Sequence, residues 1–501
     1  MAATPIPVNA IVKRSYAAFE QYRNTTLAGR AAFLERIAVE LEAIAVVLVE
    51  TAAAETHLAD ARLRGELQRT QWQLYSYGQA CAEGSWLDIR IDRPLEQPQG
   101  APVEPSWKVS ERKQDLRKML VPLGPVVVFG ASNFPFAYST AGGDTACALA
   151  AGCPVIVKAH PAHAATSRLV AAAVERAAVA CGLPANVFLH VEGGLEEGQA
   201  LVLHPLTRAV GFTGSLEGGR ALFDLAQQRP EPIPVFAEMG SVNPVFLLPE
   251  YTKQNASALA KQYVQSITAS AGQFCTNPGL LIGVESPELQ HFQKLLAHEM
   301  AAIPPAEMLH PGIATAFQHK RADALDVDGV EVAGTLSCPV GRNESIPTLA
   351  TVSGEDFLCN PLLQEEVFGP YSLLVRCSDH AQVLEVARSL KGQLTTTLMA
   401  TPGDLRSFAA LQPLLRERCG RFVCNSVPTG VEVAPAMMHG GPYPATTDSR
   451  FTAVGADGIR RFARPLCYQN WDDDLMPPEL QKDNPLGLLR MVNGEWTRAG
   501  F

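Results

Sequence analysis

The spacing of apolar side chains changes in character along the chain. Residues 8 to about 85 are rich in Ala, Leu, Glu and Arg, and stretches such as Ala31–Ala38 place apolar residues at helical spacing. This spacing predicts helices. Residues 94–106 are instead rich in Pro, Gln and Gly, which predicts a loop. We therefore expect a helical segment that ends before an irregular connection.

From about residue 107, short apolar runs alternate with helical stretches. The expected strands are Val126–Phe129, Val155–Lys158, Val187–His190 and Ala209–Phe212, and helices are expected around 167–180, 196–203 and 216–228. Such alternation predicts a parallel sheet covered by helices. A second α/β region is expected from near 240 to roughly 445, and the tail at 461–501 has no strong periodicity.

Composition narrows the class of protein. A chain of 501 residues is too long for a single core, so two or three domains are expected. The net charge of −10 argues against a nucleic-acid partner. The 11 cysteines include no Cys-x-x-Cys pair, which favours reduced thiols in a cytoplasmic protein. Neither a secretory signal nor an apolar run of about 18 residues is visible, so no membrane span is expected.

The stretch Gly272–Gly279 reads Gly-Gln-Phe-Cys-Thr-Asn-Pro-Gly. Gly272 allows close approach of the backbone, and Pro278-Gly279 favours a turn. Between them, Cys275 can stand at an exposed bend with a free backbone N–H, the setting in which a thiol attacks a carbonyl carbon. A buried apolar role is the commoner one for a cysteine, so this octapeptide is only suggestive by itself.

Three further motifs carry groups that complement a thiol. Glu238 follows a probable strand, Pro234–Ala237, where burial would raise the pKa of a carboxyl and suit it to general-base work. Asn133, in Ser-Asn-Phe-Pro, offers a neutral amide donor for an oxyanion. Glu366 and Phe368 lie in Glu-Glu-Val-Phe-Gly-Pro. Taken singly, each has a plainer interpretation as a turn or surface residue.

Two segments have features of a cofactor site. Lys158 ends an expected strand, at the edge where open α/β sheets bind cofactors. Gly214 and Ser215 precede an expected helix, whose first N–H groups can bind phosphate. The glycine pattern there is not the dinucleotide-binding fingerprint, so it is weak evidence alone. His160 and His163 could contact a phosphate, but they are equally well explained as loop histidines without a ligand. No metal site is expected there, because no third ligand is evident.

Together these motifs resemble the aldehyde dehydrogenase superfamily, over nearly the whole chain. The resemblance implies that Cys275 attacks an aldehyde, forming first a thiohemiacetal and then a thioester. It also implies that Asn133 and the Cys275 N–H hold the oxyanion. Glu238 would activate the water that hydrolyses the thioester. The resemblance therefore predicts oxidation of an aldehyde to a carboxylic acid.

The resemblance also implies how a nicotinamide cofactor is held. Lys158 would bind the adenosine ribose, Gly214 and Ser215 the phosphates, and Glu366 the nicotinamide ribose, with Phe368 near the ring. Many NAD-preferring members carry a glutamate three residues after this lysine. Here that residue is Pro161. Repulsion of a 2′-phosphate is then absent, so NADP is expected, with NAD also possible.

The expected fold is α/β, with a Rossmann-like cofactor domain, an α/β catalytic domain and a small oligomerisation element that would give a homodimer or homotetramer. The expected boundaries are 1–103 with 123–239 for the cofactor domain, 240–445 for the catalytic domain, and 104–122 with 461–501 for the oligomerisation element. Where many members carry a proton-relaying glutamate, near 446–451, this chain has no glutamate. Any such relay is therefore in doubt.

The motifs are most similar to the branch of the superfamily that acts on 2-oxoglutarate semialdehyde (2,5-dioxopentanoate). An NADP-linked fatty aldehyde dehydrogenase is the main alternative. A carboxylated substrate would need a cation, for which Arg62, Arg64 and Arg69 are candidates, although they are equally explained as solvated helix charges. A CoA-acylating dehydrogenase and a non-catalytic, crystallin-like protein are less favoured, because Glu238, Cys275 and the other motifs are present together.

Overall fold

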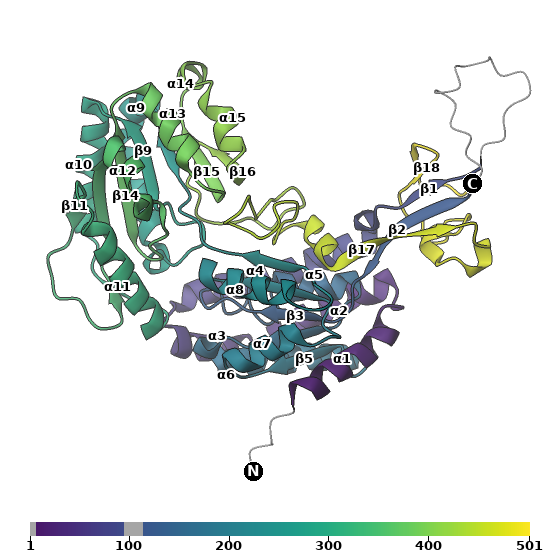
Figure 1. Ribbon diagram of the computed structural model, residues 1–501. Coiled ribbons are helices and arrows are strands. Elements are labelled where there is room, and N and C mark those ends of the chain that lie inside the picture. The colour runs from purple at the N-terminus through teal and green to yellow at the C-terminus, as the bar shows by residue number, and fades with distance from the viewer. Residues whose placement is uncertain (1–6, 95–113) are drawn as a thin grey trace, which may run out of the picture.

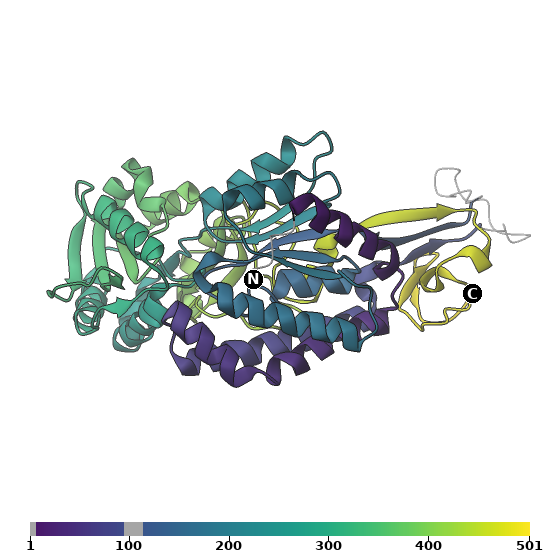
Figure 2. The same cartoon turned by 90° about the horizontal axis from the view of Figure 1, so that it is seen from below.

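The computed structural model describes residues 7–94 and 114–501. The loop expected at 94–106, apart from its first residue, and residues 104–113 of the expected oligomerisation element lie outside the described residues. The chain forms two α/β bodies that face one another, and a third, smaller sheet extends from one of them (Figure 1). Figure 2 shows the same arrangement from below, with the small sheet projecting as an arm.

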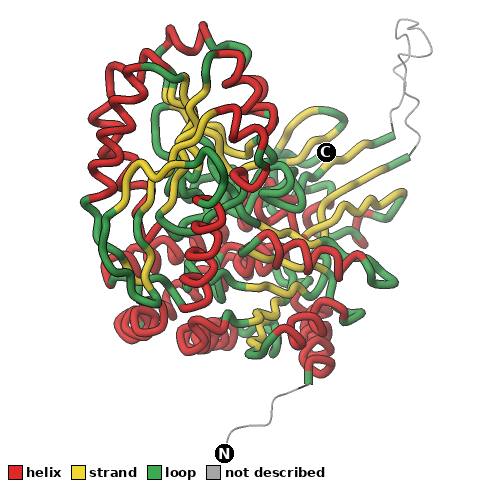
Figure 3. The backbone as a smooth tube through the Cα atoms, turned by 60° about the vertical axis from the view of Figure 1, so that its left-hand side comes forward, coloured by secondary structure: helices red, strands yellow, loops and turns green. Residues whose placement is uncertain are grey.

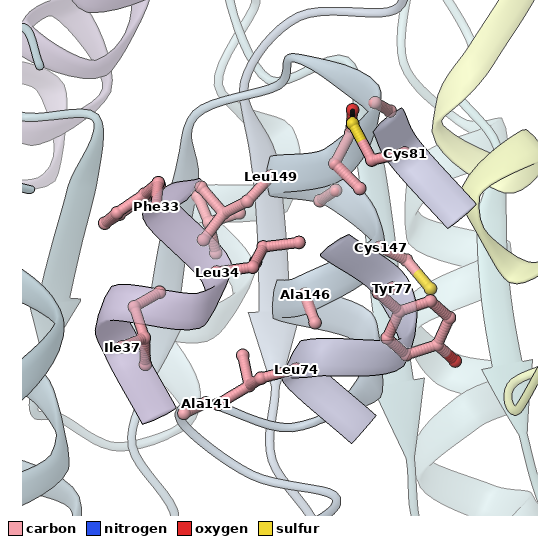
Figure 4. Close-up of a cluster of buried hydrophobic side chains, with 14 of the residues drawn as sticks. Phe33, Leu34, Ile37, Leu74, Tyr77, Cys81, Ala141, Ala146, Cys147 and Leu149 are labelled. Atoms are coloured by element: carbon pink, nitrogen blue, oxygen red, sulfur yellow. Dashed lines mark hydrogen bonds between the residues drawn. The ribbon is translucent and has the colours of Figure 1, made fainter. Parts of the chain in front are cut away.

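The helical N-terminal segment is confirmed. Its helices are α1 (Val8–Tyr22), α2 (Leu27–Glu42), α3 (Ala45–Thr56) and α4 (Asp60–Glu83). Thr26 caps α2 by accepting a hydrogen bond from the Gly29 N–H, and α4 ends at Gly84, whose φ of 78° suits glycine. Apolar side chains of α2 and α4, among them Leu34 and Leu74, pack with those of α5 into one buried cluster (Figure 4).

A five-stranded parallel sheet forms the first body, in the order β5-β4-β3-β6-β7. Its strands are β3 (Val126–Phe129), β4 (Val155–Lys158), β5 (Phe188–Val191), β6 (Ala209–Thr213) and β7 (Val235–Glu238). Its helices are α5 (Gly143–Ala151), α6 (Ala164–Ala180), α7 (Leu195–Leu203) and α8 (Leu216–Gln227). The strand order reverses beside β3, and open α/β sheets bind ligands outside the carboxyl ends of the strands at such a point.

A seven-stranded sheet forms the second body, in the order β11-β13-β14-β9-β8-β15-β16, with only β11 antiparallel to its neighbour. Its strands are β8 (Val245–Leu247), β9 (Leu280–Val284), β11 (Glu331–Thr335), β13 (Thr348–Ser353), β14 (Tyr371–Cys377), β15 (Gln393–Met399) and β16 (Cys419–Cys424). Its helices are α9 (Pro249–Thr268), α10 (Pro287–Ala301), α11 (Pro311–Leu325), α12 (Gly354–Cys359), α13 (His380–Ser389), α14 (Pro402–Ser407) and α15 (Leu411–Arg416), and β10 (Ala306–Glu307) pairs with β12 (Glu344–Ser345).

The third sheet has the order β17-β2-β1-β18-β19. It joins β1 (Arg90–Asp92) and β2 (Leu116–Pro122) to β17 (Ala463–Gln469), β18 (Arg490–Val492) and β19 (Glu495–Thr497). Residues 90–92, which lie within the 1–103 expected for the cofactor domain, pair with β2 and β18 of this sheet.

The loops gather where the two larger sheets face one another (Figure 3). The chain crosses from β7 to β8 at residues 239–244, and the segment after β16 returns to this region, where Thr446 forms a bridge with Glu238. The ends of strands from both bodies therefore converge on one place. Among the described residues, none of the helices is long and apolar enough to cross a membrane.

Candidate active site

The segment that carries Cys275 is shaped by an unusual turn at the end of α9. Ser270, Ala271 and Gly272 all have positive φ, at 48°, 55° and 68°. A Cβ built on Gly272 would lie 2.2 Å from the carbonyl carbon of Gly369, so only glycine fits there. The left-handed turn therefore presses the Cys275 segment against the Glu-Glu-Val-Phe-Gly-Pro motif.

Asn243 fixes the backbone of the Cys275 segment. Its Nδ2 donates to the carbonyl oxygens of Cys275 and Asn277, at 2.9 Å each. Gln393 in turn holds this region, because its Oε1 accepts from the backbone N–H groups of Val242 and Asn243 at 2.9 and 3.2 Å. The sequence analysis did not predict either role. The available signal for Asn243 was its place in the same motif as Glu238.

Cys275, Glu238 and His439 come together between the two bodies. The Nε2 atom of His439 lies 3.6 Å from Cys275 Sγ and 3.0 Å from Glu238 Oε1. The ligand-type atoms of all three side chains lie within 4.8 Å of one another. Glu238 ends β7, as expected, and its side chain is 3% exposed, against 1% for His439. The imidazole therefore contacts both the thiol and the carboxylate away from bulk water.

His439 is a functional candidate that the sequence analysis missed. Its backbone N–H donates to Thr452 Oγ1 at 2.8 Å, and its carbonyl accepts from the Ala453 N–H at 2.7 Å. It stands directly before Gly440 and Gly441, and glycines permit the close packing of backbone that brings this segment into the site. That pair of glycines was the only local signal, and a lone histidine beside it is not specific.

The charge state of Cys275 follows from its surroundings. Burial, and then the nearby Glu238 carboxylate, hold the pKa of the Cys275 thiol well above its usual value. At neutral pH the resting thiol is therefore protonated and needs an adjacent base before it can act. Both carboxylate oxygens of Glu238 are buried and have no aligned hydrogen-bond partner among the described residues. Such an unsatisfied carboxylate is suited to accept a proton.

Asn133 lies beside the nucleophile segment. Its Nδ2 donates to the carbonyl oxygen of Gln273 at 3.1 Å, and its own carbonyl oxygen accepts from Arg62 at 2.8 Å. The neighbouring rings of Phe134 and Phe274 meet edge to face, with centroids 5.5 Å apart. The Cys275 backbone N–H has no acceptor in the described part of the chain. The second N–H of the Asn133 amide and the Cys275 backbone N–H are thus two donors at the segment that carries the sulfur.

The three candidate arginines differ in their partners. Arg64 pairs with Asp60 at 2.7 Å at the surface, and Arg62 pairs with buried Glu66 at 2.8 Å. Arg69 pairs with no carboxylate among the described residues.

The contacts of Arg69 point toward the reactive centre. It donates to the hydroxyl of Tyr138 at 3.1 Å and to the carbonyl of Val431 at 3.3 Å. The Tyr138 ring lies 6.0 Å from that of His439. Arg69 therefore reaches the reactive centre through Tyr138.

Lys158 and the histidines that follow it lie at the carboxyl edge of the five-stranded sheet. Burial lowers the pKa of Lys158, with the nearby Glu197 carboxylate opposing the shift. Burial, together with the charges of His163, His310 and Lys158, lowers the pKa of His160 to about 3. His160 is uncharged at neutral pH, so Lys158 is the cation of the pair.

Ser215 and Gly214 have local partners. Ser215 Oγ caps α8 by accepting from the Gly218 N–H at 3.1 Å, which leaves the hydroxyl hydrogen for another acceptor. The Gly214 N–H donates to the carbonyl of Glu238 at 3.0 Å. The backbone of Gly214 therefore links the expected phosphate site to the carboxylate near the thiol, while its N–H is already occupied.

Glu366 and Phe368 line a cavity of about 340 Å³ that also borders Phe274 and Asn277. Glu366 Oε1 accepts a hydrogen bond from the Ser241 N–H at 3.4 Å. Burial raises the pKa of the Glu366 carboxyl to about 7. The cavity thus connects the second carboxylate motif to the segment that carries the thiol.

Glu238 lines a second cavity, of about 300 Å³. His439, Thr446 and Asp448 also line it. Asp448 is held by Arg450 at 2.8 Å. Asp448 is therefore a carboxylate within 446–451, the segment where the resemblance implies a proton-relaying glutamate in many members. It is, however, paired with Arg450.

Comparison with known proteins decides the family. The family model described as "Aldehyde dehydrogenase family" matches residues 1–443. The chain belongs to the aldehyde dehydrogenase family. An oxidoreductase that acts on aldehydes, as the motifs predicted, is confirmed at this level.

Two curated relatives cover most of the chain. Alpha-ketoglutaric semialdehyde dehydrogenase 2 of Azospirillum brasilense is 47% identical over 95% of this chain and 89% of its own length. Alpha-ketoglutaric semialdehyde dehydrogenase of Acinetobacter baylyi is 44% identical over 99% of this chain and 92% of its own length. These values place this aldehyde dehydrogenase far nearer to them than to the solved structures below.

Solved structures confirm the fold. Methylmalonate-semialdehyde dehydrogenase from Oceanimonas doudoroffii has a TM-score of 0.76 at 18% identity, over 93% of this chain and 90% of its own. Succinic semialdehyde dehydrogenase from Streptococcus pyogenes was solved with NADP⁺ as the cofactor. It has a TM-score of 0.75 at 17% identity, over 93% of this chain and 96% of its own. The predicted α/β aldehyde dehydrogenase fold is therefore confirmed.

Proposed function

We propose that this protein oxidises 2-oxoglutarate semialdehyde to 2-oxoglutarate, with NADP or NAD as the hydride acceptor. The observation that carries the proposal is the contact of one imidazole, His439, with both the Cys275 thiol and the Glu238 carboxylate. A thiol, a base and a carboxylate within 4.8 Å suit acyl transfer through sulfur. The names of the two curated relatives support the choice of aldehyde.

The first step activates the sulfur. Because the pKa of Cys275 is raised, its proton must leave as the aldehyde approaches. His439 Nε2 lies 3.6 Å from the sulfur and can receive this proton, and the Glu238 carboxylate stabilises the imidazolium that forms. The sulfur then adds to the aldehyde carbon and gives a thiohemiacetal on Cys275.

The second step requires stabilisation of an oxyanion. The Asn133 amide and the Cys275 N–H are neutral donors held by the fold, so they can bind the developing charge without reorganising. Asn243 keeps the Cys275 peptide in place while the oxygen gains charge. Loss of hydride from the reacting carbon then leaves a thioester on Cys275.

The residues present fit a nicotinamide dinucleotide. Lys158, the first turn of α8 and the buried Glu366 carboxyl follow the carboxyl edge of the sheet toward the cavity beside Phe274. Lys158 and Ser215 would hold the ribose and phosphates, and Glu366 and Phe368 the nicotinamide end. When bound, the cofactor supplies the pyridine ring that accepts the hydride.

Deacylation uses the same carboxylate. Both oxygens of Glu238 are buried without an aligned hydrogen-bond partner among the described residues, and Glu238 lines the second cavity, which can hold the attacking water. The carboxylate accepts a proton from that water, which then attacks the thioester and releases the acid. A buried base at this position also argues against a CoA-acylating role, in which a second thiol replaces water.

Arg69 is the best cation for the far carboxylate of such a substrate. Arg62 and Arg64 are each paired with a glutamate or aspartate, whereas Arg69 meets only neutral acceptors among the described residues. Tyr138 connects Arg69 to the reactive centre. A carboxylate bound there would form charge-assisted hydrogen bonds, which are the strong ones.

The decisive experiment compares 2-oxoglutarate semialdehyde with a straight-chain alkyl aldehyde. Arg69→Ala is expected to lower kcat/KM for the carboxylated aldehyde by about ten- to a hundred-fold, the usual value of a hydrogen bond to a charged group. It should leave the alkyl aldehyde almost unchanged. Arg64→Ala, on the same helix but at the surface, is the matched control. Equal losses for both aldehydes would contradict a carboxylate role.

An alkyl aldehyde is the second candidate, because the rings of Phe134, Tyr138 and Phe274 make an apolar wall beside Asn133. A strong preference for alkyl chains in the wild-type protein would select it.

We further propose that the protein acts in the cytoplasm as a homodimer or homotetramer. Exposed side chains of β17, at the edge of the third sheet, support an interface there.

A further inference from the structure

We propose that Cys275, His439 and Glu238 form a zinc-binding site whose occupation reversibly blocks the enzyme. The proposal rests on the donor set and its geometry in the resting protein, independently of which aldehyde is oxidised. Sulfur, imidazole nitrogen and carboxylate oxygen are the three ligand types that zinc takes most often from proteins. Here one atom of each type is present within 4.8 Å.

The distances fit a tetrahedral ion. Zinc–sulfur bonds of about 2.3 Å and zinc–nitrogen bonds of about 2.0–2.1 Å place the two ligands about 3.6 Å apart at the tetrahedral angle. Cys275 Sγ and His439 Nε2 are 3.6 Å apart. His439 Nε2 and Glu238 Oε1 are 3.0 Å apart, which two bonds of about 2.0–2.1 Å span at an angle of about 95°. Small rotations of the Glu238 side chain would open this angle and bring its carboxylate into place around the ion.

Burial favours an ion at this place. Both oxygens of Glu238 lack an aligned hydrogen bond among the described residues, so the carboxylate has unused capacity for a cation. The side chains of Glu238 and His439 are 3% and 1% exposed, which leaves the ion open only toward the cavities. A water would take the fourth position. Mg²⁺ and Ca²⁺ are disfavoured because they prefer oxygen ligands.

Binding has a defined proton balance. Zinc displaces the proton of the Cys275 thiol, which leaves to solvent, and His439 binds through the lone pair of a neutral ring. No electrons are transferred. The sulfur lone pair that would attack an aldehyde is then held by the ion, and Glu238 can no longer accept a proton from water. The site would therefore prevent both acylation and deacylation until a chelator removes the metal.

The test uses the full-length protein in metal-free buffer, without aldehyde or cofactor. Zn²⁺ is titrated calorimetrically, Co²⁺ is added separately as a spectroscopic probe, and alkylation of Cys275 by iodoacetamide is followed by peptide mass spectrometry. We expect one tight zinc ion per chain and a thiolate-to-cobalt charge-transfer band. We also expect strong slowing of Cys275 alkylation, reversed by a chelator. Alkylation at an unchanged rate under saturating zinc would overturn the proposal.

Variants locate the site. His439→Asn and Glu238→Gln should each weaken zinc binding by at least about ten- to a hundred-fold, the cost of even indirect changes around a metal. Cys424→Ser, at an exposed cysteine, and His319→Asn, at an exposed histidine, should not change it. Thermal melting checks that each variant is folded. Tight binding that survives both site substitutions, or a wild-type cobalt spectrum without the thiolate band, would refute the site.

The outcome is separable from the proposed function. Zinc binding without turnover of any aldehyde would support this site and refute the oxidation. Aldehyde turnover, with Cys275 alkylated equally fast in the presence and absence of zinc, would support the oxidation and refute the zinc site.

Discussion

The nucleophile side and the cofactor side of the candidate active site are built differently. Around Cys275, side chains from distant segments contact one another: His439 meets Glu238, and Asn133 donates to the backbone beside the sulfur. Along the cofactor edge, residues are held mainly by their own elements. Ser215 caps the helix that follows it, and the carboxylate that influences Lys158, Glu197, lies on α7 of the same body.

This difference separates two kinds of effect. A change on the nucleophile side removes a group that acts on the reacting atoms, so it should lower kcat. A change on the cofactor side removes one of several contacts with a large ligand, so it should mainly raise the KM or Kd of the cofactor. The predictions below test that division, from the largest expected effect to the smallest.

The largest loss is expected from Cys275→Ala. Without the sulfur no thioester can form, so turnover should fall by at least about three orders of magnitude, as for other nucleophiles. The rate of cofactor reduction, followed by absorbance, measures this. Cys424→Ser, at an exposed cysteine, should keep the wild-type rate. Substantial turnover by Cys275→Ala would move the chemistry to another residue.

His439→Asn should come next. The variant lacks the base that receives the thiol proton, and loss of a general base typically costs about 10²–10⁴ in rate. The pre-steady-state burst of reduced cofactor should slow by this factor at neutral pH and recover as pH rises toward the raised pKa of Cys275. His319→Asn serves as the matched control at the surface. An unchanged burst would show that the imidazole has only a packing role.

On the cofactor side, Pro161→Glu should change selectivity rather than rate. A carboxylate three residues after Lys158 would repel the 2′-phosphate of NADP, and one such charge near the protein surface is worth about 1–3 kcal/mol, or about five- to 160-fold. The ratio of kcat/KM for NADP to that for NAD measures this. Pro161→Gln has the same size without the charge. If both variants shift the ratio equally, charge is not the cause.

The smallest effect is a pH dependence of cofactor affinity. The Glu366 carboxyl, with its pKa raised to about 7, is protonated below that pH and ionised above it. Only the ionised form accepts hydrogen bonds from both ribose hydroxyls, so affinity should rise as pH increases through about 7. Fluorescence titrations at about pH 6 and about pH 8 bracket this pKa. Glu366→Gln should remove the dependence, and a dependence that persists would assign it elsewhere.

The sequence predicted the strands well because local signals decide them. The runs at 126–129 and 155–158 are strands with the same limits in the structure, and those at 187–190 and 209–212 differ by one residue. The pairing of β1 was not predictable from local sequence. Its partner β18 lies about 400 residues further along the chain, and its other partner, β2, is separated from it by the segment 93–115. Non-local pairing leaves no mark in local composition.

The candidate site shows the same limit. Cys275, Glu238 and Asn133 stand in short motifs that are visible in the sequence, and the structure brings the segments that carry them together. Asn243 and His439 were missed, because a buried amide and a lone histidine have no pattern until the fold brings them to the sulfur. The neutral state of His160 was equally hidden, since it depends on burial by segments far along the chain.

The most direct test of the account is the mass of the trapped intermediate. Glu238→Gln should still form the thioester but hydrolyse it slowly, because the group that activates water is gone. After rapid mixing with cofactor and 2-oxoglutarate semialdehyde, peptide mass spectrometry should find the acyl group on Cys275, together with a burst of about one reduced cofactor per chain. Normal turnover with no adduct on Cys275, or an acyl group on another side chain, would contradict the account.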